Sequence, residues 1–512
     1  MSIRTLRKIL TALFLPLTLG ACATVSLDIP KISSTAIPET EQTSLARYSD
    51  AWRAEQPGHD AFYPLSRGLD AFGSRLSLID HAEVSIDAQY FLMKPDDAGL
   101  VLATKLVEAA ERGVRVRLLL DDVFTTVKDG GLALLDEYPN VEVRIFNPVS
   151  RQGLYALNYA GNFKLANRRM HNKAFIADNQ IAIVGGRNIA VEYFQLEASG
   201  EFVDFDMLSA GPIVQQVSNS FDRYWNHELA VPLEALIANK DDGKREERIA
   251  FAQRRMADAG DSIYAQAINT ELMRRFYDGA VKPYFAKSEL VVDDPRKLLS
   301  KIADEHKIVA GQIAAALAAA QSEVVIFTPY LIPRQSGLDL LREARRRGVR
   351  IVILTNSLAT NNHTAVHSAY ASYRKPLVEM GVELWEARAD AAKVVAEDGS
   401  TMLDHLTLHA KGMVIDRRLV IAGSLNLDPR SIDINSELAL FLDSPELGER
   451  MASTALDAIP NGAYRLKLDD RGRITWHATI DGEQVVETTE PQASWWRRVS
   501  AWFQKIAPED QL

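Results

Sequence analysis

The apolar residues of this chain follow the same order of patterns twice. Residues 82–91 (AEVSIDAQYF) form a short apolar run of strand length, and residues 322–331 (SEVVIFTPYL) form another. Each run is followed by a helical pattern, a glycine and a β-branched run, which end at residues 106–122 in the first case and 340–357 in the second. A glycine after a helix is typical of a C-cap, and β-branched runs are typical of buried parallel strands. The pattern predicts a strand–helix–strand unit in each half.

The two units lie at a nearly constant interval, which indicates an internal duplication. Equivalent positions are 240, 235 and 238 residues apart: Glu83 and Glu323, Gly113 and Gly348, His171 and His409. A chain of 512 residues is long for one hydrophobic core and natural for two. We therefore expect an α/β fold made of two halves with mixed sheets, packed around a pseudo-two-fold axis, with a shared site at the seam.

The patterning divides the chain into six expected segments: 1–21, 22–60, 61–235, 236–310, 311–458 and 459–512. The third and fifth are the two α/β halves. The fourth contains the charged run NKDDGKREERIAFAQRR, which predicts a solvated helical connector, with a regulatory or membrane-contacting role as the alternative. The second contains Pro30, Pro38 and many Ser and Thr residues, which predict a flexible tether.

The first segment has the layout of a cleavable secretory leader. Basic residues precede an apolar run at 9–19 that is too short to span a bilayer. The residues from Leu19 to Cys22 (LGAC) resemble the bacterial lipoprotein box, in which the thiol is acylated and the chain is cut before it. This resemblance implies a protein anchored through Cys22 at the periplasmic face of the cell envelope, and Ala23 implies the outer membrane. An ordinary signal peptide and an uncleaved interfacial anchor are the alternatives.

Composition narrows the class of protein further. Cys22 is the only cysteine, which excludes an internal disulfide framework and a multi-thiolate metal site. The apolar fraction of 47% and the charged fraction of 25% are typical of folded domains. The net charge of −10 argues against a general nucleic-acid binder, because such binding depends on Lys and Arg that neutralise phosphates. No nucleic-acid partner is expected.

A longer motif occurs once in each half. The strings HNKAFIADNQIAIVGGRN and HAKGMVIDRRLVIAGSLN share one spacing: His, any residue, Lys, four residues, Asp, six residues, Gly, two residues, Asn. Two copies of so specific a string at the repeat interval are a strong functional signal. The candidate catalytic and phosphate-binding residues are His171, Lys173, Asp178, Asn188, His409, Lys411, Asp416, Ser424 and Asn426.

These residue types suit chemistry at a phosphate ester. His and Lys two apart lie on one face of a strand, so imidazole and ammonium can point at one phosphate. Lys supplies positive charge for the non-bridging oxygens, and Asn supplies amide donors that do not titrate. Where two histidines meet, one can attack phosphorus while the other protonates the departing alkoxide and then deprotonates the incoming alcohol or water. Lysines and amides take over the charge stabilisation of a metal ion, so no metal or other cofactor is expected.

The double motif resembles the signature of the phospholipase D superfamily, and the resemblance covers most of residues 60–460. It implies a phosphohistidine intermediate, with His171 as nucleophile and His409 as general acid and base; the residues by themselves do not separate these roles. In that family an acid further along the chain orients each imidazole. The resemblance assigns this role to Glu437 in NSELAL and, through a less regular spacing, to Asp204 in FVDFDM.

Two details of the motif carry separate expectations. Asp178 and Asp416 have the opposite pleat parity to the motif lysines, so a strand turns them away from the phosphate and favours structural support over direct catalysis. The halves differ where the first has Gly186 and the second has Ser424. Loss of that hydroxyl should weaken one phosphate contact by ~1 kcal/mol without removing the nucleophile.

The substrate class follows from the anchor and the charge balance. Both favour a lipid over DNA or RNA. The strings GGRNIAVEYF and SLNLDPRSIDINSEL are similar to those of C-type cardiolipin synthases. That similarity implies phosphatidyl transfer at a membrane surface, with phosphatidylglycerol as acceptor and phosphatidylglycerol or phosphatidylethanolamine as donor. A phospholipase D hydrolase that releases phosphatidate is the alternative, and a non-catalytic lipid-binding lipoprotein remains open from another class.

The last segment ends in an amphipathic helical pattern. Trp495, Val499, Trp502 and Ile506 recur at offsets of four, three and four, with basic residues on their flanks. This composition is typical of a helix at a membrane interface. The same stripe could instead dock onto the protein's own core, and the residues leave both alternatives open.

Overall fold

The computed structural model describes residues 24–127, 129–152, 154–196, 201–237, 243–299, 308–391 and 406–504. The leader and Cys22 lie outside the described residues, as does Ile506. Across the described ranges no helix combines the length and the apolar character that a membrane span requires.

The first half is built on a mixed sheet with the strand order β9-β4-β3-β2-β5-β6-β8-β1. Its strands are β1 (Asp60–Leu65), β2 (Ser85–Tyr90), β3 (Arg115–Asp121), β4 (Val141–Phe146), β5 (Ala174–Ala177), β6 (Ile181–Gly185), β8 (Asp206–Ala210) and β9 (Ala230–Pro232). The strands β2, β3 and β4 are parallel, whereas β5, β6, β8 and β1 pair antiparallel. The predicted strand–helix–strand unit is confirmed.

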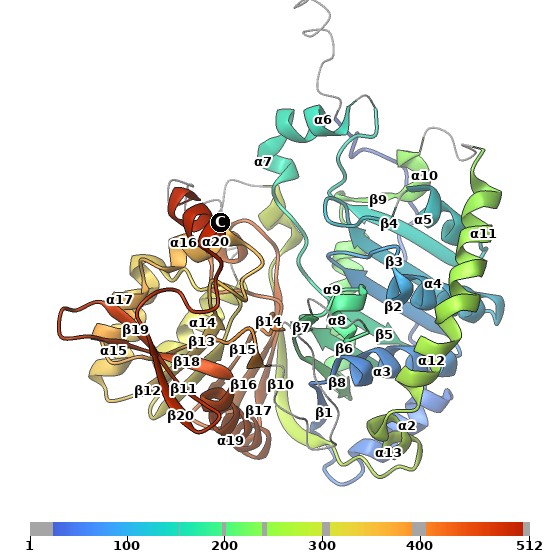
Figure 1. Cartoon of the computed structure of the whole chain (residues 1–512). Helices are drawn as coiled ribbons and strands as arrows, with labels where there is room; N and C mark the ends of the chain where they lie inside the picture. The colour runs from blue at the N-terminus through green and yellow to red at the C-terminus, as the bar shows by residue number, and fades with distance from the viewer. Residues whose placement is uncertain are drawn as a thin grey trace, which may run out of the picture.

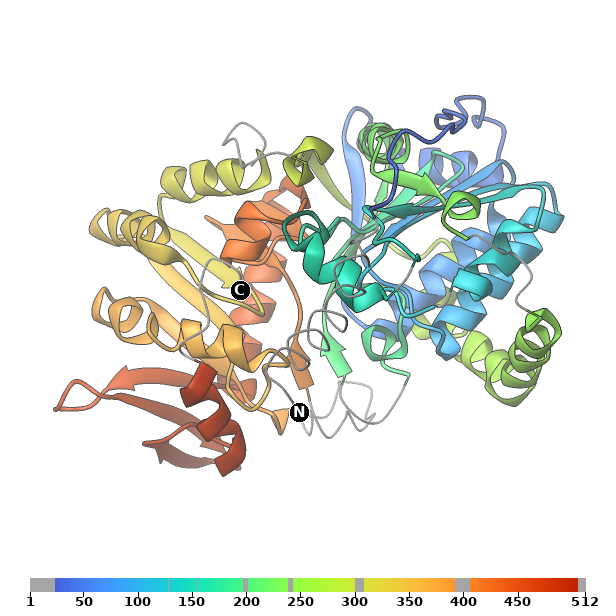
Figure 2. The same cartoon turned by 90° about the horizontal axis from the view of Figure 1, so that it is seen from above.

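The second half repeats this order as β10-β17-β16-β15-β11-β12-β13-β18 and then adds β19 and β20. Its strands are β10 (Tyr284–Val292), β11 (Glu323–Phe327), β12 (Arg350–Asn356), β13 (Glu383–Ala387), β15 (Gly412–Ile415), β16 (Leu419–Gly423), β17 (Leu438–Asp443), β18 (Ala463–Leu468), β19 (Ile474–Ile480) and β20 (Glu483–Glu487). β1 pairs with β10 at the centre, so the order reads the same outward in both directions. The expected pseudo-two-fold arrangement is confirmed, and the halves lie side by side (Figures 1 and 2).

Helices cover both faces of each sheet. Those of the first half are α3 (Gly68–His81), α4 (Asp97–Glu111), α5 (Asp129–Asp136), α6 (Tyr155–Gly161), α7 (Phe163–Ala166), α8 (Val191–Phe194), α9 (Pro212–Trp225) and α10 (Leu233–Leu236). Those of the second half are α14 (Ile308–Ala319), α15 (Arg334–Arg346), α16 (Thr364–Tyr370), α17 (Arg374–Glu379), α18 (Pro429–Asp433), α19 (Pro445–Gly462) and the terminal α20 (Trp495–Gln504). One buried apolar cluster includes Phe221 of α9 and Leu447 of α19, so the two halves share part of their core.

The segment expected as a helical connector is helical only in part. It contains α11 (Arg245–Arg255), α12 (Asp261–Ile268) and α13 (Glu271–Tyr277), but it then continues into β10 at the centre of the sheet. The prediction of a connector through residue 310 was therefore wrong for this strand. The exposed Lys287 and Glu289 alternate with the buried Ala286 and the half-buried Ser288 and Leu290, and that alternation marks a strand with one exposed face.

The expected flexible tether is packed against the first half in its described part. The buried guanidinium of Arg117 donates to the carbonyl of Ser34 at 2.9 Å, and the amide of Ala36 donates to Asp222 at 2.8 Å. Residues 44–53 form the helix α2 (Ser44–Arg53), whose Trp52 is buried. A buried cation needs acceptors, and these carbonyls and apolar contacts fix a segment whose composition alone suggests disorder.

Candidate active site

The two motif copies begin immediately before β5 and β15, and each one pairs with backbone from the other half. The amide of His171 donates to the carbonyl of Ser436 at 2.9 Å. The amide of His409 donates to the carbonyl of Val203 at 2.7 Å, next to a two-stranded parallel sheet of β7 (Glu201–Val203) and β14 (Leu406–Leu408). Each histidine is thus fixed against the residue that directly precedes the acid of the opposite half.

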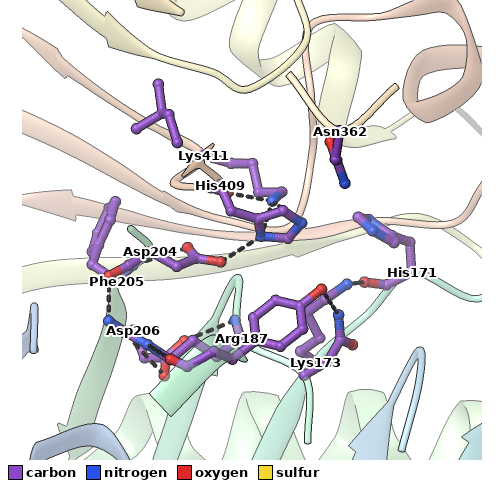
Figure 3. Close-up of polar contacts among 12 residues, drawn as sticks. His171, Lys173, Arg187, Asp204, Phe205, Asp206, Asn362, His409 and Lys411 are labelled. Atoms are coloured by element: carbon purple, nitrogen blue, oxygen red, sulfur yellow. Dashed lines mark hydrogen bonds and ion pairs between the residues drawn. The ribbon is translucent and has the colours of Figure 1, made fainter. Parts of the chain in front are cut away.

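This pairing gives each imidazole a carboxylate partner across the seam. Nδ1 of His171 lies 2.9 Å from the carboxylate of Glu437, and Nδ1 of His409 lies 2.6 Å from that of Asp204. In Figure 3 the rings of His171 and His409 approach each other from opposite halves. The sequence singled out both acids, but it did not indicate that each serves the other half.

The motif lysines complete the site. The ammonium of Lys173 donates to the carbonyl of His171, and that of Lys411 lies 3.1 Å from Nε2 of His409 (Figure 3). All four motif side chains are buried, with between 1% and 7% of their surface exposed. Two imidazoles and two ammonium groups thus come together at the seam, where the lysines can stabilise the charge of a phosphodiester.

Burial lowers the pKa of all four basic groups. Burial, followed by the charges of Lys173 and Lys411, holds the pKa of His171 well below its usual value. The same two causes, burial and Lys411, lower the pKa of His409 to about 3. Burial lowers the pKa of Lys173 to about 7 and that of Lys411 to about 8. Both imidazoles are therefore neutral near pH 7.

The two carboxylates differ in charge state. Burial raises the pKa of Glu437 to about 7, although Lys173 opposes this shift. Burial would also raise the pKa of Asp204, but Lys411 and His409 outweigh it and leave that pKa below its usual value. The site thus has one firmly ionised acid next to His409 and one acid that titrates near neutrality next to His171.

Asp178 and Asp416 lie at the far ends of β5 and β15. The carboxylate of Asp178 accepts the amides of Glu83, Val84 and Ser85 at the start of β2, at distances from 2.8 to 3.2 Å. Asp416 accepts three equivalent amides at the start of β11. Although both count among the motif's candidate catalytic residues, their contacts brace the sheet and do not reach the imidazoles.

The predicted phosphate-binding side chains lie close behind the site. The amide of Asn188 donates to the hydroxyl of Tyr193 at 2.9 Å, and the Tyr193 ring packs edge-on against His409 at 5.2 Å between centroids. Asn426 is buried, and in the described part of the chain its side-chain oxygen has no hydrogen-bond partner. That oxygen is an acceptor, so it suits a hydroxyl group of a ligand and not an anionic phosphate oxygen.

Ser424 is placed differently from the prediction. Its hydroxyl donates to the carboxylate of Glu437 and accepts the amide of Leu438 at 3.1 Å, so it steadies the acid instead of pointing at a phosphate. At the equivalent Gly186, an added Cβ would lie 2.2 Å from Oδ1 of Asp204. The difference between the halves therefore reflects the space that each acid needs. The prediction that Ser424 contacts the phosphate was therefore wrong, because its hydroxyl is bonded to Glu437 and Leu438.

Aromatic rings that sequence analysis missed support both imidazoles. Phe91 packs edge-on against His171 at 4.8 Å, and Phe202 stacks on His409 at 4.9 Å between ring centroids. Phe91 ends the first predicted strand, which offered a signal for its position. Phe202 precedes Asp204 by two residues, and only the pairing between the halves brings it to His409. Over the described residues, no group of three or more His, Cys, Asp or Glu side chains is arranged to hold a metal ion.

Comparison with known proteins decides the family. A family model described as the PLD-like domain of cardiolipin synthase matches residues 76–225 and 313–455, one stretch in each half. The chain belongs to this phospholipase D-like family. Cardiolipin synthase C of Escherichia coli (strain K12) is 36% identical over 462 residues, which cover 90% of this chain and 97% of that protein.

One further relative of this phospholipase D-like chain and one solved structure extend the comparison. The cardiolipin synthase of Oceanobacillus iheyensis is 25% identical over 81% of this chain and 73% of that protein. The crystal structure of phosphatidylserine synthase from Haemophilus influenzae Rd KW20 matches with a TM-score of 0.55 at 14% identity, over 82% of this chain and 92% of that one. The similarity to phosphatidylserine synthase is one of fold alone.

Proposed function

We propose that this protein is a phosphatidyltransferase of cardiolipin-synthase type that works through a covalent phosphohistidine. Family membership supports the transfer of phosphatidyl groups. The observation that carries the chemistry is the meeting of two imidazole–carboxylate pairs and two ammonium groups in one buried site. Such a site can supply a nucleophile, a proton donor and charge stabilisation for a phosphodiester without further groups.

His171 is the proposed nucleophile. When its Nδ1–H donates to Glu437, the lone pair of Nε2 faces the seam, and the lowered pKa keeps that nitrogen free of a proton near pH 7. Nε2 attacks phosphorus, the bond from phosphorus to the head-group oxygen breaks, and a phosphatidyl-histidine forms. Glu437 then stabilises the positive charge that develops on the ring.

His409 is the proposed general acid and base. Its partner Asp204 is ionised, and an ionised carboxylate favours the imidazolium that a proton donor requires. A phosphodiester between Lys173 and Lys411 would offset part of their charge and raise the pKa of His409 toward the working range. Nε2–H then protonates the leaving alkoxide, and the same nitrogen takes a proton from the incoming alcohol.

The second half-reaction defines the product. By similarity to cardiolipin synthases, the acceptor is the glycerol hydroxyl of phosphatidylglycerol, and the donor is phosphatidylglycerol or phosphatidylethanolamine. Attack of that hydroxyl on the phosphatidyl-histidine breaks the P–N bond and releases cardiolipin. Attack by water would release phosphatidate instead, as in a phospholipase D.

The proposed location is the periplasmic side of the bacterial cell envelope. The LGAC sequence that ends at Cys22 supports acylation of its thiol, and Ala23 supports the outer membrane. Several acyl chains hold a protein stably at a bilayer, because each buried CH₂ contributes about 0.8 kcal/mol. Substrate and enzyme would then share one surface.

The deciding experiment incubates the purified full-length protein with vesicles of phosphatidylglycerol, alone or mixed with phosphatidylethanolamine, and identifies products by mass spectrometry. We expect cardiolipin, and no product from His171→Ala. Phosphatidate without cardiolipin would identify a hydrolase.

Covalent trapping tests the intermediate separately. With a radiolabelled phosphatidyl donor, wild-type protein quenched in alkaline SDS, which preserves the acid-labile P–N bond, should carry label that His171→Ala lacks. The remote His477→Ala is the matched control and should label normally. A wild-type protein that binds vesicles but never becomes labelled or forms product would be a lipid-binding protein without catalysis.

A further inference from the structure

The terminal helix α20 presents its aromatic side to solvent. Trp495, Trp496, Trp502 and Phe503 are 64%, 74%, 63% and 61% exposed. Soluble proteins normally turn such side chains inward, since each one buries a large apolar area. Of the two alternatives that the sequence left open, docking of the aromatic stripe onto the protein's own core is therefore wrong for Trp495 and Trp502, the stripe's tryptophans within the described residues.

The polar side of α20 attaches the helix to the protein. The guanidinium of Arg497 donates to the carbonyl of Leu358 at 2.6 Å, and that of Arg498 donates to the carbonyl of Glu490 at 2.7 Å. Ser368 of α16 donates to the carbonyl of Ala501 at 2.7 Å, and Ala501 is buried. These hydrogen bonds hold the amphipathic helix with its aromatic side outward. The helix is therefore not a loose terminus.

A second exposed apolar surface lies on the other half, over α6 and α7. Its members are Leu154, Tyr155, Leu157, Phe163 and Leu165, which are between 37% and 69% exposed. Lys164 is exposed among them. Aromatic and aliphatic side chains mixed with Lys or Arg are typical of the membrane–water interface.

Both surfaces adjoin the catalytic seam. The chain leaves α7 at Ala166 and reaches His171 five residues later, and Arg430 of the opposite half donates to Asn167 at 2.7 Å on the way. On the other side, the loop that receives Arg497 leads directly to Asn362, whose side chain points toward the two imidazoles in the view of Figure 3. The two apolar surfaces therefore flank the seam from opposite halves.

The described start of the chain lies on this side as well. Figure 1 shows α6, α7, α16 and α20 on the upper side of the molecule, and α13 at the opposite end. Lys31 donates to the carbonyl of Ala230 at 3.0 Å in β9, which is also on the upper side. Cys22 precedes the first described residue by two positions, so an acyl anchor there would emerge near the same face.

We propose that α6–α7 and α20 form a two-part docking surface that seats the protein on a phospholipid bilayer, with the catalytic seam facing the lipid head groups. The proposal rests on the proposed function, because a phospholipid substrate and an anchor at Cys22 are what place a bilayer at this side. A bilayer can contact two separate apolar surfaces at once, one on each half. Lipid then reaches His171 and His409 without leaving the interface.

The first test measures the depth of single spin labels. The full-length lipoprotein is reconstituted in vesicles of phosphatidylglycerol and phosphatidylethanolamine, and a nitroxide is attached to Leu157→Cys, Phe503→Cys or, as the matched control, Tyr277→Cys of α13, where Tyr277 is 53% exposed. Since Cys22 is the only native cysteine, the unsubstituted chain reports whether its thiol is blocked. We expect greater collision with oxygen than with an aqueous nickel chelate at positions 157 and 503, and the reverse at 277.

Either of two other outcomes would overturn the proposed docking surface. If all three labels remain in water, the anchor alone holds the protein at the membrane. If the labels at 157 and 503 are shielded from both reagents and shielding depends on protein concentration, a second copy of the chain covers the surface. These depths do not depend on turnover, so loss of the proposed activity would leave the test intact.

A kinetic comparison provides the second test. The double variant Trp495→Ser/Trp502→Ser is compared with Tyr277→Ser on vesicles and on a monomeric short-chain phosphatidylglycerol. We expect at least a tenfold loss of rate on vesicles for the double variant alone, and unchanged rates on the monomeric lipid for both. Equal loss on both substrates, or no loss on vesicles, would contradict a docking role. If the wild-type protein acts on neither substrate, the proposed function fails, and the spin-label test still decides docking.

Discussion

Gly186 and Ser424 occupy equivalent motif positions, and each one lies next to the acid that orients an imidazole. Ser424 donates its hydroxyl to Glu437, whereas Gly186 leaves room for the carboxylate of Asp204. The two acids also differ in pKa: burial raises that of Glu437 to about 7 although the Ser424 hydroxyl opposes this shift, whereas Lys411 and His409 hold that of Asp204 below its usual value. The asymmetry suits a site in which His171 and His409 perform different steps.

Gly186→Ala tests the space reserved for Asp204. The new Cβ would lie 2.2 Å from Oδ1, so the carboxylate must move away from His409. We expect a tenfold to hundredfold loss of transfer rate, the range found when an orienting partner is lost. Gly311→Ala is the matched control, because an added Cβ there meets no atom within 4 Å. Wild-type activity in Gly186→Ala would show that the contact between Asp204 and His409 is dispensable.

Neutral replacements of Glu437 and Asp204 should show whether the two acids differ in charge state. Below its pKa of about 7, Glu437 is mostly protonated, so Glu437→Gln resembles the native group at pH 6 and removes a charge at pH 8. Asp204 is ionised at both values, so Asp204→Asn removes a charge throughout. We expect the loss of kcat/KM in Glu437→Gln to grow from pH 6 to pH 8, while that in Asp204→Asn stays large. Parallel profiles for the two variants would refute the assignment.

At the scale of elements, segments outside the motif hold the two halves in place. β10 pairs with both β1 and β17, which makes it the strand that joins the sheets. The N-terminal segment with α2 covers the first half through hydrogen bonds and through Trp52. The indole of Trp52 donates to the carbonyl of Val281 at 3.1 Å, and its ring lies 6.2 Å from that of Phe276.

Trp52→Ala tests whether this segment is structural. Removing a buried indole should lower the free energy of unfolding by about 3–5 kcal/mol, through lost burial and the cavity that remains. Ile32→Ala in the same segment is the control, since Ile32 is 82% exposed and should change stability by less than about 0.5 kcal/mol. Urea unfolding followed by circular dichroism measures both. A flexible tether would make the two variants equally stable.

At the scale of the whole molecule, the catalytic groups lie where the two halves pack together. His409 is buried at this seam with a pKa of about 3, against 6.5 for an ordinary histidine. Because the folded pKa is the lower one, the unfolded chain takes up the proton first as pH falls below 6.5. The contribution of His409 to the free energy of unfolding is therefore lost progressively as the pH falls from 6.5 to 3.

His409→Gln should make the protein less sensitive to acid. Between pH 7 and pH 5 the histidine accounts for a loss of about 2 kcal/mol of unfolding free energy, from 1.36 kcal/mol per pH unit below 6.5. The variant should lose that much less than the wild type over this range in urea titrations. His81→Gln is the matched control, because His81 is exposed in the last turn of α3 and should behave as the wild type. If all three proteins lose the same unfolding free energy between pH 7 and pH 5, His409 does not contribute to the acid sensitivity.

The amino-acid sequence was sufficient to predict the duplicated fold and the chemistry of the site. The repeat interval and the strand parity of His and Lys can both be read directly from the order of residues. They therefore predicted two halves with the motifs meeting at a seam. Glu437 and Asp204 were also within reach of the sequence, because the resemblance fixed their approximate positions after each motif. The packed N-terminal segment and the strand β10 were not, since their composition alone favours disorder and helix.

The pairing of each acid with the histidine of the other half became visible only in the folded chain. His171 and Glu437 are 266 residues apart, and backbone pairing across the seam at Ser436 and Val203 brings each acid to the opposite half. The folded chain also turns the tryptophans of α20 outward, because Arg497 and Arg498 find their acceptors on the protein surface. A pattern along the chain reports which face of an element is apolar, whereas the partner of that face is set by distant residues that only folding brings together.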